Sequence, residues 1–519
     1  MTGSAQCGKS SLLAWLVRHG FRAGTIRDRA VHAVVPMDGV GIQGAVWALS
    51  SQLGVTARTT GDLVSILKPD SRRTVIVLPD LHAGIGGAAD FAELVIGLTS
   101  LSQVRLITEV RNTNVLFPEL QTAAPAVMDL DERQWNGPAR AQPKPDGQVR
   151  HPEPVSPAPD LDDPASVCSA NPVRVTAGYE ATESNHGGLR TAWMRAGQAL
   201  LQDQPPAERA LILQTLLGDS ADPRLASRLA RLAAGSAWEL LWSRVSGDIT
   251  PPWPGPVSAL TAGAGPLDGQ ALLSDHLGVL RTVDLANASP TGRLAEPVKE
   301  TIALCALPDA TVLTLNHEGL HAQKPDQPVQ ESGPPTLLDD GPTPMEQAIE
   351  IFNTTLSGST STAMAATAEC LAMGAADGSV HAIGLNTTDS AVLTEQLHHG
   401  SVTSLAAVTL PLGDNKTTAV LLYSGGADGC VRAWAPGHEP QKAPVAERPC
   451  PVTALSAVHT TDGPRLAIAW SDGLIGYHRL ESGAAASLGP GLRANGLIMT
   501  ADGDLVVGTN EAVFRLTPR

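Results

Sequence analysis

The chain is poor in aromatic residues and lysine, and it has no concentrated positive charge. Aromatics make up 3% of its 519 residues, and seven lysines stand against twenty-nine arginines. The formal net charge is −16, and no run of five or six basic residues occurs. Nucleic acid and anionic membranes both select a concentrated positive surface, so the composition argues against either as the main partner.

Paired cysteines and long apolar runs are also missing. The six cysteines are scattered without a C-x-x-C pair, which argues against a disulfide scaffold or a zinc ribbon. The sequence shows no leader-like start and no run of about 18 apolar residues. We therefore predict a cytoplasmic chain. The excess of Arg over Lys, with abundant Ala, Gly and Pro, is typical of a GC-rich genome such as an actinobacterial one.

Residues 1–135 alternate between β-prone and helical patterns. Apolar runs at 31–37, 74–80, 104–111 and 125–131 are separated by helical patterns at 10–17, 42–53 and 91–102. Strands that alternate with helices predict a parallel α/β sheet covered by helices. Residues 1–135 are therefore predicted to form an α/β domain.

Two segments of different composition follow. Residues 136–185 are rich in Pro, Asp, Ser and Gly and lack periodicity, which predicts a linker. Residues 186–250 carry apolar side chains at three- and four-residue steps as far as Val245, which predicts a short helical block.

Residues 251–519 contain six copies of one pattern, a β-prone run, a tight turn and a second β-prone run. The copies lie at 272–285, 311–322, 370–385, 421–436, 466–480 and 504–516. Asp-Gly turns between β-prone runs are hairpin signals, and successive turn glycines lie 41 to 59 residues apart. This period predicts an all-β propeller of six blades, or of seven if a further blade is hidden, for example one shared between the chain ends.

The segment GSAQCGKS at 3–10 fits the phosphate-binding pattern G-x-x-x-x-G-K-[ST] without mismatch. It runs directly into the helical pattern SSLLAWLV. The candidate nucleotide-binding residues are Gly3, Ser4, Ala5, Gln6, Cys7, Gly8, Lys9, Ser10 and Ser11. Backbone N–H groups of such a loop wrap phosphates, Lys9 would reach the β- and γ-phosphates, and Ser10 would bind Mg²⁺. The alternative is a glycine-rich loop that only caps a helix.

Two further residues follow buried strands of the predicted sheet. Asp80 ends TVIVLPD and is the candidate for the Mg²⁺ shell. Arg111 ends VRLITEVR and is placed to sense a γ-phosphate. Both positions also suit ordinary strand-end residues.

Two departures weaken the case for hydrolysis. Only Met1 and Thr2 precede the loop, so the strand that normally leads into a P-loop is expected to be missing or truncated. Leu81, His82 and Ala83 follow Asp80, where fast hydrolysis would need a water-orienting carboxylate. Nucleotide binding is therefore better supported than turnover, and any ATPase activity is expected to be weak.

These motifs resemble those of a bacterial STAND-type P-loop ATPase joined to a WD-repeat β-propeller. The matching segments are GSAQCGKSSLL, TVIVLPDL, VRLITEVR and the D-G-x-[VL] repeats such as ADGCVRAW. The resemblance implies ATP and Mg²⁺ as cofactors, nucleotide-dependent homo-oligomerisation, and a propeller that binds a protein partner in signal transduction. The alternative is a non-catalytic propeller scaffold with a vestigial P-loop domain.

Three other signals are better explained by structure. HEGLH at 317–321 matches a zinc-protease motif but follows a strand pattern, so we predict a hairpin turn. The pair His398–His399 is predicted to lie in a solvated loop rather than a metal site. Trp238, Trp242 and Trp253 are predicted to pack between the helical block and the propeller.

Overall fold

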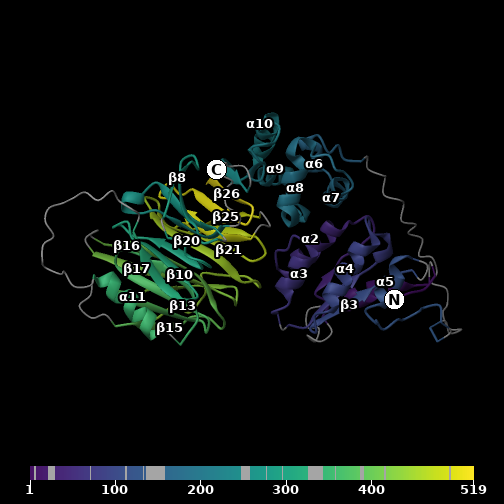
Figure 1. Ribbon diagram of the computed structural model, residues 1–519, viewed down its shortest axis with the longest axis horizontal. Coiled ribbons are helices and arrows are strands. Elements are labelled where there is room, and N and C mark those ends of the chain that lie inside the picture. The colour runs from purple at the N-terminus through teal and green to yellow at the C-terminus, as the bar shows by residue number, and fades with distance from the viewer. Residues whose placement is uncertain are drawn as a thin grey trace. The chain divides into compact units, whose positions relative to one another are not determined.

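The computed structural model describes most of the chain. The described residues are 1–4, 7–20, 30–70, 72–111, 114–132, 134–135, 158–246, 257–275, 277–294, 296–324, 343–356, 358–385, 391–413, 417–489 and 493–519. They form two compact units, Met1–Arg209 and Ala210–Arg519, coloured along the chain in Figure 1. None of the described helices is long and apolar enough to cross a membrane. The predicted multidomain fold, an α/β region with helices followed by a propeller, is confirmed.

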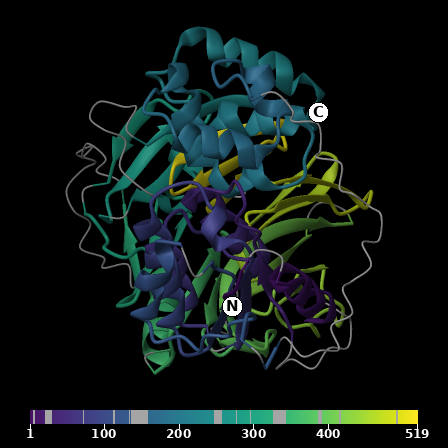
Figure 2. The ribbon, with the colours of Figure 1, turned by 90° about the vertical axis from the view of Figure 1, so that its right-hand side faces the viewer.

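A three-stranded parallel sheet is the base of the first unit, drawn in purple and blue in Figures 1 and 2. Its order is β1–β2–β3, from Ala33–Val34, Thr74–Leu78 and Val104–Thr108. The accompanying helices are α1 (Lys9–Gly20), α2 (Ile42–Leu53), α3 (Thr60–Leu67), α4 (Ala88–Thr99) and α5 (Leu116–Gln121). Leu13 of α1 packs with Val77 of β2 in one apolar cluster, which fixes the helix that follows the P-loop on the sheet.

Met1 and Thr2 continue the sheet beyond β3. The Met1 nitrogen donates to the Thr108 carbonyl at 2.7 Å, and Thr2 forms a parallel bridge with Asp129. The strand predicted at 125–131 is reduced to this bridge. Because Met1 lies level with the last residue of β3, the loop that follows begins at the carboxyl edge of the sheet.

Five short helices follow in the chain. They are α6 (Pro164–Ser169), α7 (Pro172–Glu180), α8 (Leu189–Ala196), α9 (Pro206–Thr215) and α10 (Pro223–Leu232). The prediction of a linker over 136–185 is wrong where α6 and α7 form, while 136–157 lies outside the described residues. Asp163 and Asn171 cap these helices with side-chain oxygens, and a proline follows each cap. Proline at the first helical turn lacks only an N–H that the helix does not use, so it marks helix starts here.

Six antiparallel sheets form the propeller. Blade 1 contains β5 (Val257–Ala262), β6 (Gln270–Asp275), β7 (Leu280–Asp284) and β8 (Pro290–Arg293), and blade 2 contains β9 (Ala303–Ala306), β10 (Val312–Asn316) and β11 (Gly319–Gln323). Blade 3 contains β12 (Ser361–Ala366), β13 (Cys370–Ala375), β14 (Ser379–Gly384) and β15 (Leu393–Gln396), and blade 4 contains β16 (Val402–Leu412), β17 (Thr417–Gly426), β18 (Cys430–Trp434) and β19 (Ala446–Glu447). Blade 5 contains β20 (Val452–Thr460), β21 (Gly463–Trp470), β22 (Ile475–Arg479) and β23 (Ala484–Leu488), and blade 6 contains β24 (Ala494–Met499), β25 (Leu505–Thr509), β26 (Ala512–Pro518) and β4 (Trp238–Val245). Each predicted repeat overlaps the second and third strands of one blade, and the described residues hold no seventh blade.

The sixth blade is closed by β4, which comes from the other end of this unit. Its register with β26 runs from Ala512 opposite Val245 to Pro518 opposite Trp238. The helix predicted to reach Val245 is therefore wrong over these eight residues, because their backbone completes the edge of a sheet.

Two tryptophans of β4 pack within the propeller rather than between it and the helical block. Trp238 is fully buried, donates through Nε1 to the Ser487 carbonyl at 3.2 Å and meets Tyr477 edge to face. Trp242 donates through Nε1 to the Leu285 carbonyl of blade 1 at 2.8 Å. These bonds tie blade 6 to both of its neighbours, and Trp253 lies outside the described residues.

A second repeat, missed in the sequence, marks the start of the innermost strand of every blade. Its copies are VSAL (257–260), TIAL (301–304), STAM (361–364), VTSL (402–405), VTAL (452–455) and ANGL (494–497). Their third and fourth residues line a central cavity of about 320 Å³. Small residues at the third position leave room for six strands to converge. No Asp, Glu, His, Lys or Arg side chain is among the described residues that line the cavity.

Blade 2 has three strands, and helix α11 (Pro344–Thr355) protects its outer edge. The Asn353 side chain accepts from the Leu320 N–H and donates to the Leu320 carbonyl, both at 3.0 Å. A side-chain amide thus takes the two backbone bonds that a fourth strand would take. Phe352, 1% exposed, anchors the helix in the core of blades 2 and 3.

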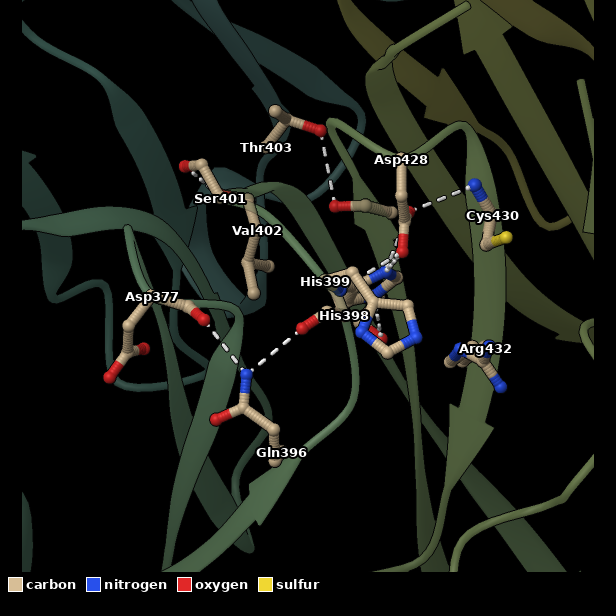
Figure 3. A network of polar contacts seen from close by, with 12 residues as sticks. Asp377, Gln396, His398, His399, Ser401, Val402, Thr403, Asp428, Cys430 and Arg432 are labelled. Carbon is tan, nitrogen blue, oxygen red and sulfur yellow. Dashed lines mark hydrogen bonds and ion pairs between the residues drawn. The ribbon is translucent and has the colours of Figure 1, made fainter. Parts of the chain in front are cut away.

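A buried polar network joins blades 3 and 4, as Figure 3 shows. His398 Nδ1 lies 3.0 Å from Asp428 Oδ1, and its Nε2 lies 2.9 Å from Ser424 Oγ. Burial lowers the pKa of His398 despite the neighbouring carboxylate, so the ring is neutral near pH 7. A carboxylate only accepts, so Nδ1–H donates to Asp428 and Nε2 accepts from the Ser424 hydroxyl.

This network is structural although it contains the residue types of a Ser-His-Asp triad. Ser424 is 0% exposed and His398 is 2% exposed, so no substrate reaches the hydroxyl. The predicted solvated loop is wrong for His398 and correct for His399, which is exposed. Asp428 also accepts from the backbone N–H groups of His399 and Cys430. The carboxylate therefore holds the β17–β18 turn to the segment before β16.

We expect His398→Ala to lower the free energy of unfolding of the propeller by about 2 to 3 kcal/mol. The substitution leaves a buried hydroxyl and a carboxylate without their partner, and each loss is costly. Urea denaturation followed by tryptophan fluorescence measures the change. The matched control is His399→Ala, one residue away and exposed; equal stability of the two variants would contradict the assignment.

A shortened chain that keeps β4 is expected to behave differently from one that lacks it. A chain of residues 210–519 retains the closing strand, whereas a chain of residues 251–519 exposes the whole outer edge of β26. Open strand edges pair with other molecules. Light scattering after gel filtration should therefore find the longer chain monodisperse and the shorter one aggregated, and equal behaviour would refute this role of β4.

Candidate functional site

The described residues Gly3, Ser4, Cys7 and Gly8 precede the N-terminus of α1, which begins at Lys9. Gly3 and Gly8 adopt φ of +138° and +94°, which favour glycine at both fixed positions of the motif. The first bond of the helix joins the Leu12 N–H to the Gly8 carbonyl at 3.0 Å. A helix that begins this way leaves the N–H groups of Lys9 and the next two serines without an intrahelical acceptor. Ala5 and Gln6 lie outside the described residues.

The Lys9 ammonium lies inside this loop rather than in solvent. Its side chain is 5% exposed, and Nζ donates to the carbonyls of Gly3 at 2.9 Å and Ser4 at 2.7 Å. Nζ also lies 3.3 Å from Cys7 Sγ. An ammonium has three donors, so these neighbours use its full capacity. The cation is positioned at the centre of the loop by neutral acceptors.

Ser10 points to a carboxylate that the sequence reasoning missed. Its hydroxyl lies 3.3 Å and 3.4 Å from the two oxygens of Glu109, which is 2% exposed. Glu109 directly follows β3. Its N–H donates to the Leu78 carbonyl and its carbonyl accepts from the Leu81 N–H, both at 3.0 Å, so the residue bridges the ends of β2 and β3.

A recognisable signal for Glu109 was present in the sequence. An acidic residue at the end of a buried strand singled out Asp80, and Glu109 occupies the same kind of position one strand later. Arg111, the residue singled out after this strand, lies two residues further on.

Asp80 and Arg111 lie near the same sheet edge but make no described contact with the loop. Asp80 follows β2 with φ of +52°, is half-buried and precedes the turn Leu81–Ala83. Arg111 is exposed. Within the described residues, no hydrogen bond or ion pair links either side chain to Lys9 or Ser10. Their roles toward Mg²⁺ and the γ-phosphate remain predictions.

Carboxylates also fix the start of the loop. Asp131 accepts from the Ser4 N–H at 2.6 Å and from the Ser4 hydroxyl at 2.9 Å. The Asp129 carboxylate accepts from the Asp131 N–H at 3.0 Å. Carboxylates therefore contact Ser4 and Ser10 on either side of the lysine in the sequence. A polyphosphate brought to this loop would need a cation to offset the accumulated negative charge.

The donor set fits Mg²⁺ bound together with phosphates. Mg²⁺ prefers oxygen ligands and is usually held by one or two carboxylates with water and substrate phosphates. The hydroxyl of Ser10 and the carboxylate of Glu109 are such oxygens. In the described part of the chain, no group of three or more His, Cys, Asp or Glu side chains could hold a metal unaided. A metal at this site would thus depend on the nucleotide.

The zinc-protease pattern at 317–321 forms a hairpin, as predicted. Strands β10 and β11 pair from Asn316 opposite Gly319, and His321 Nε2 lies 3.3 Å from Asn316 Oδ1. All six cysteines are free. The loop at 3–10 remains the candidate site.

Comparison with known proteins adds little to this geometry. No known protein family and no curated protein matches the chain. Among solved structures it is similar to the computationally designed Ika8 protein, with 18% identity over 51% of this chain and 71% of that one. The TM-score of 0.30 is too low to support an argument. The propeller is established by the strand pairing itself, and membership of the STAND and WD-repeat families remains a prediction.

Proposed function

We propose that the chain is an ATP- and Mg²⁺-binding regulatory protein whose propeller binds a protein partner. The observation that carries the proposal is the loop at 3–10. Its two glycines adopt positive φ, its lysine is buried within it, and a helix N-terminus follows. These are the features by which a backbone loop binds phosphate.

Each residue of the site would have a separate task. The N–H groups at the start of α1 would bind phosphate oxygens, and Lys9 would exchange its loop carbonyls for the β- and γ-phosphates. Ser10 would hold Mg²⁺, with Asp80 as a candidate for its water shell. Mg²⁺ held there would offset the negative charge of the phosphates. Arg111 would report the γ-phosphate.

The propeller would supply the partner-binding surface. Its central cavity is narrow and uncharged, and its Ser-His-Asp network is buried, so the described blades offer no exposed catalytic group at either place. Propellers present loops on a rigid ring, a geometry suited to recognising another protein.

A second candidate function is a propeller scaffold with a vestigial P-loop domain. The observation that favours it is the saturation of Lys9, whose three donors are taken by the loop itself. In a loop that no longer binds a ligand, this lysine would only stabilise the loop through its hydrogen bonds to the loop carbonyls. The two candidate functions predict different effects of Lys9→Ala on ATP binding.

We expect Lys9→Ala to weaken the binding of a fluorescent ATP analogue in the presence of Mg²⁺ by roughly ten- to a hundredfold. The substitution removes charge-assisted hydrogen bonds to the phosphates. Fluorescence titration of the full chain measures the affinity. Arg18→Ala, an exposed change on the same helix, is the matched control. Equal affinity of the wild-type chain and Lys9→Ala would reject ATP binding at this loop.

Nucleotide-dependent oligomerisation separates a switch from a scaffold. Sedimentation velocity of the full chain with ATP and Mg²⁺ should show a larger species that is absent without nucleotide and absent for Lys9→Ala. The vestigial alternative predicts one sedimentation coefficient under all three conditions.

A further inference from the structure

Glu109 is a buried acid to which the proposed roles give no task. It is 2% exposed, lies at the carboxyl edge of the sheet and meets only the Ser10 hydroxyl through its side chain among the described hydrogen bonds and ion pairs. A buried carboxylate is costly unless a cation or several donors compensate it. The Ser10 hydroxyl at 3.3 Å is its described side-chain hydrogen-bond partner, and the Met1 ammonium interacts with the carboxylate electrostatically.

The direction of the Ser10 bond has a chemical consequence. A hydroxyl has one hydrogen and two lone pairs, and a carboxylate can only accept. Ser10 therefore donates its hydrogen to Glu109, which leaves its lone pairs available for a metal ion. Partners of this kind orient a metal ligand and raise its basicity.

The backbone holds Glu109 in this place firmly. Its N–H and carbonyl bond to residues at the end of β2, and the preceding residue, Thr108, closes the register of β3 with Leu78. The carboxylate is thus positioned by two strands at once, whereas Asp80 makes no described contact with Ser10.

We propose that Glu109 is the positioning residue of a Mg²⁺ site on the P-loop. It orients the Ser10 hydroxyl as a metal ligand and supplies the negative charge that Mg²⁺ neutralises. This inference rests on the proposed function. It gives the carboxylate role at the metal site to Glu109, which follows β3, whereas the sequence pattern assigned that role to Asp80, which follows β2.

The test compares the affinity of the full chain for mant-ATP in excess MgCl₂ and in excess EDTA. For the wild-type chain, Mg²⁺ should tighten binding. Glu109→Gln keeps an acceptor of the same shape but removes the charge, and it should reduce the Mg²⁺ enhancement by about tenfold. Affinity in EDTA should be unchanged or higher, because a negative charge beside the phosphates has been removed. Glu93→Gln, an exposed change on α4, is the matched control.

Different failures are distinguishable in the same titration. If wild-type and Lys9→Ala chains bind equally weakly, ATP binding is rejected and the inference falls with it. If the wild-type chain binds and Glu109→Gln keeps the whole Mg²⁺ enhancement, only the role of Glu109 is rejected. Loss of affinity in both MgCl₂ and EDTA would show a merely structural role and would also overturn the proposal.

A second variant tests the proposal even if Glu109→Gln fails to fold. Ser10→Ala removes the proposed metal ligand and, among the described residues, the only hydroxyl that contacts Glu109. It should lose the Mg²⁺ enhancement to a similar degree, and the double variant should lose no more than either single one. Additive losses would mean that the two residues act separately.

Discussion

The requirement that strand edges be satisfied governs both units of this protein. An unpaired edge leaves N–H and C=O groups that attract other chains. The propeller meets the requirement with β4, which pairs with β26 along its length, and with Asn353, whose amide replaces a missing strand on β11. In the α/β unit, Met1 and Thr2 bond β3 on one side and the 128–130 segment on the other. The position of the P-loop follows from that last pairing.

The same edge determines the electrostatics of the candidate site. Parallel strands bring their carboxyl ends together, so Glu109 and Asp80 reach the side of the sheet where the loop starts. Asp131 joins them through Ser4. A loop whose backbone favours anions is thereby surrounded by carboxylates. In the proposed function, such a site would discriminate against bare phosphate and favour phosphate that carries a divalent cation.

Local patterns predicted much of the architecture, and their failures have physical causes. Turn glycines located five of the six hairpins, because positive φ is a local requirement. The strand Trp238–Val245 was predicted as helix because its apolar spacing fits either structure, and only β26, far away in sequence, decides between them. Proline and aspartate over 158–185 were interpreted as linker composition, yet they are helix caps and first-turn residues. Asn353 had no sequence signal, because its partner is a backbone edge.

In the candidate site, the motif identified the loop but not its chemistry. Lys9 and Ser10 are adjacent, yet one is bound by neutral carbonyls and the other by a charged carboxylate. A phosphate that binds Lys9 must replace the two carbonyls and the sulfur that now contact its ammonium. A metal that binds Ser10 need not break the hydrogen bond to Glu109, because that bond uses the hydroxyl hydrogen and not its lone pairs. In the proposed function, the metal–nucleotide complex is therefore the species that the loop accepts. Ser10 and Glu109 would hold the cation while Lys9 exchanges its carbonyl partners for phosphate oxygens.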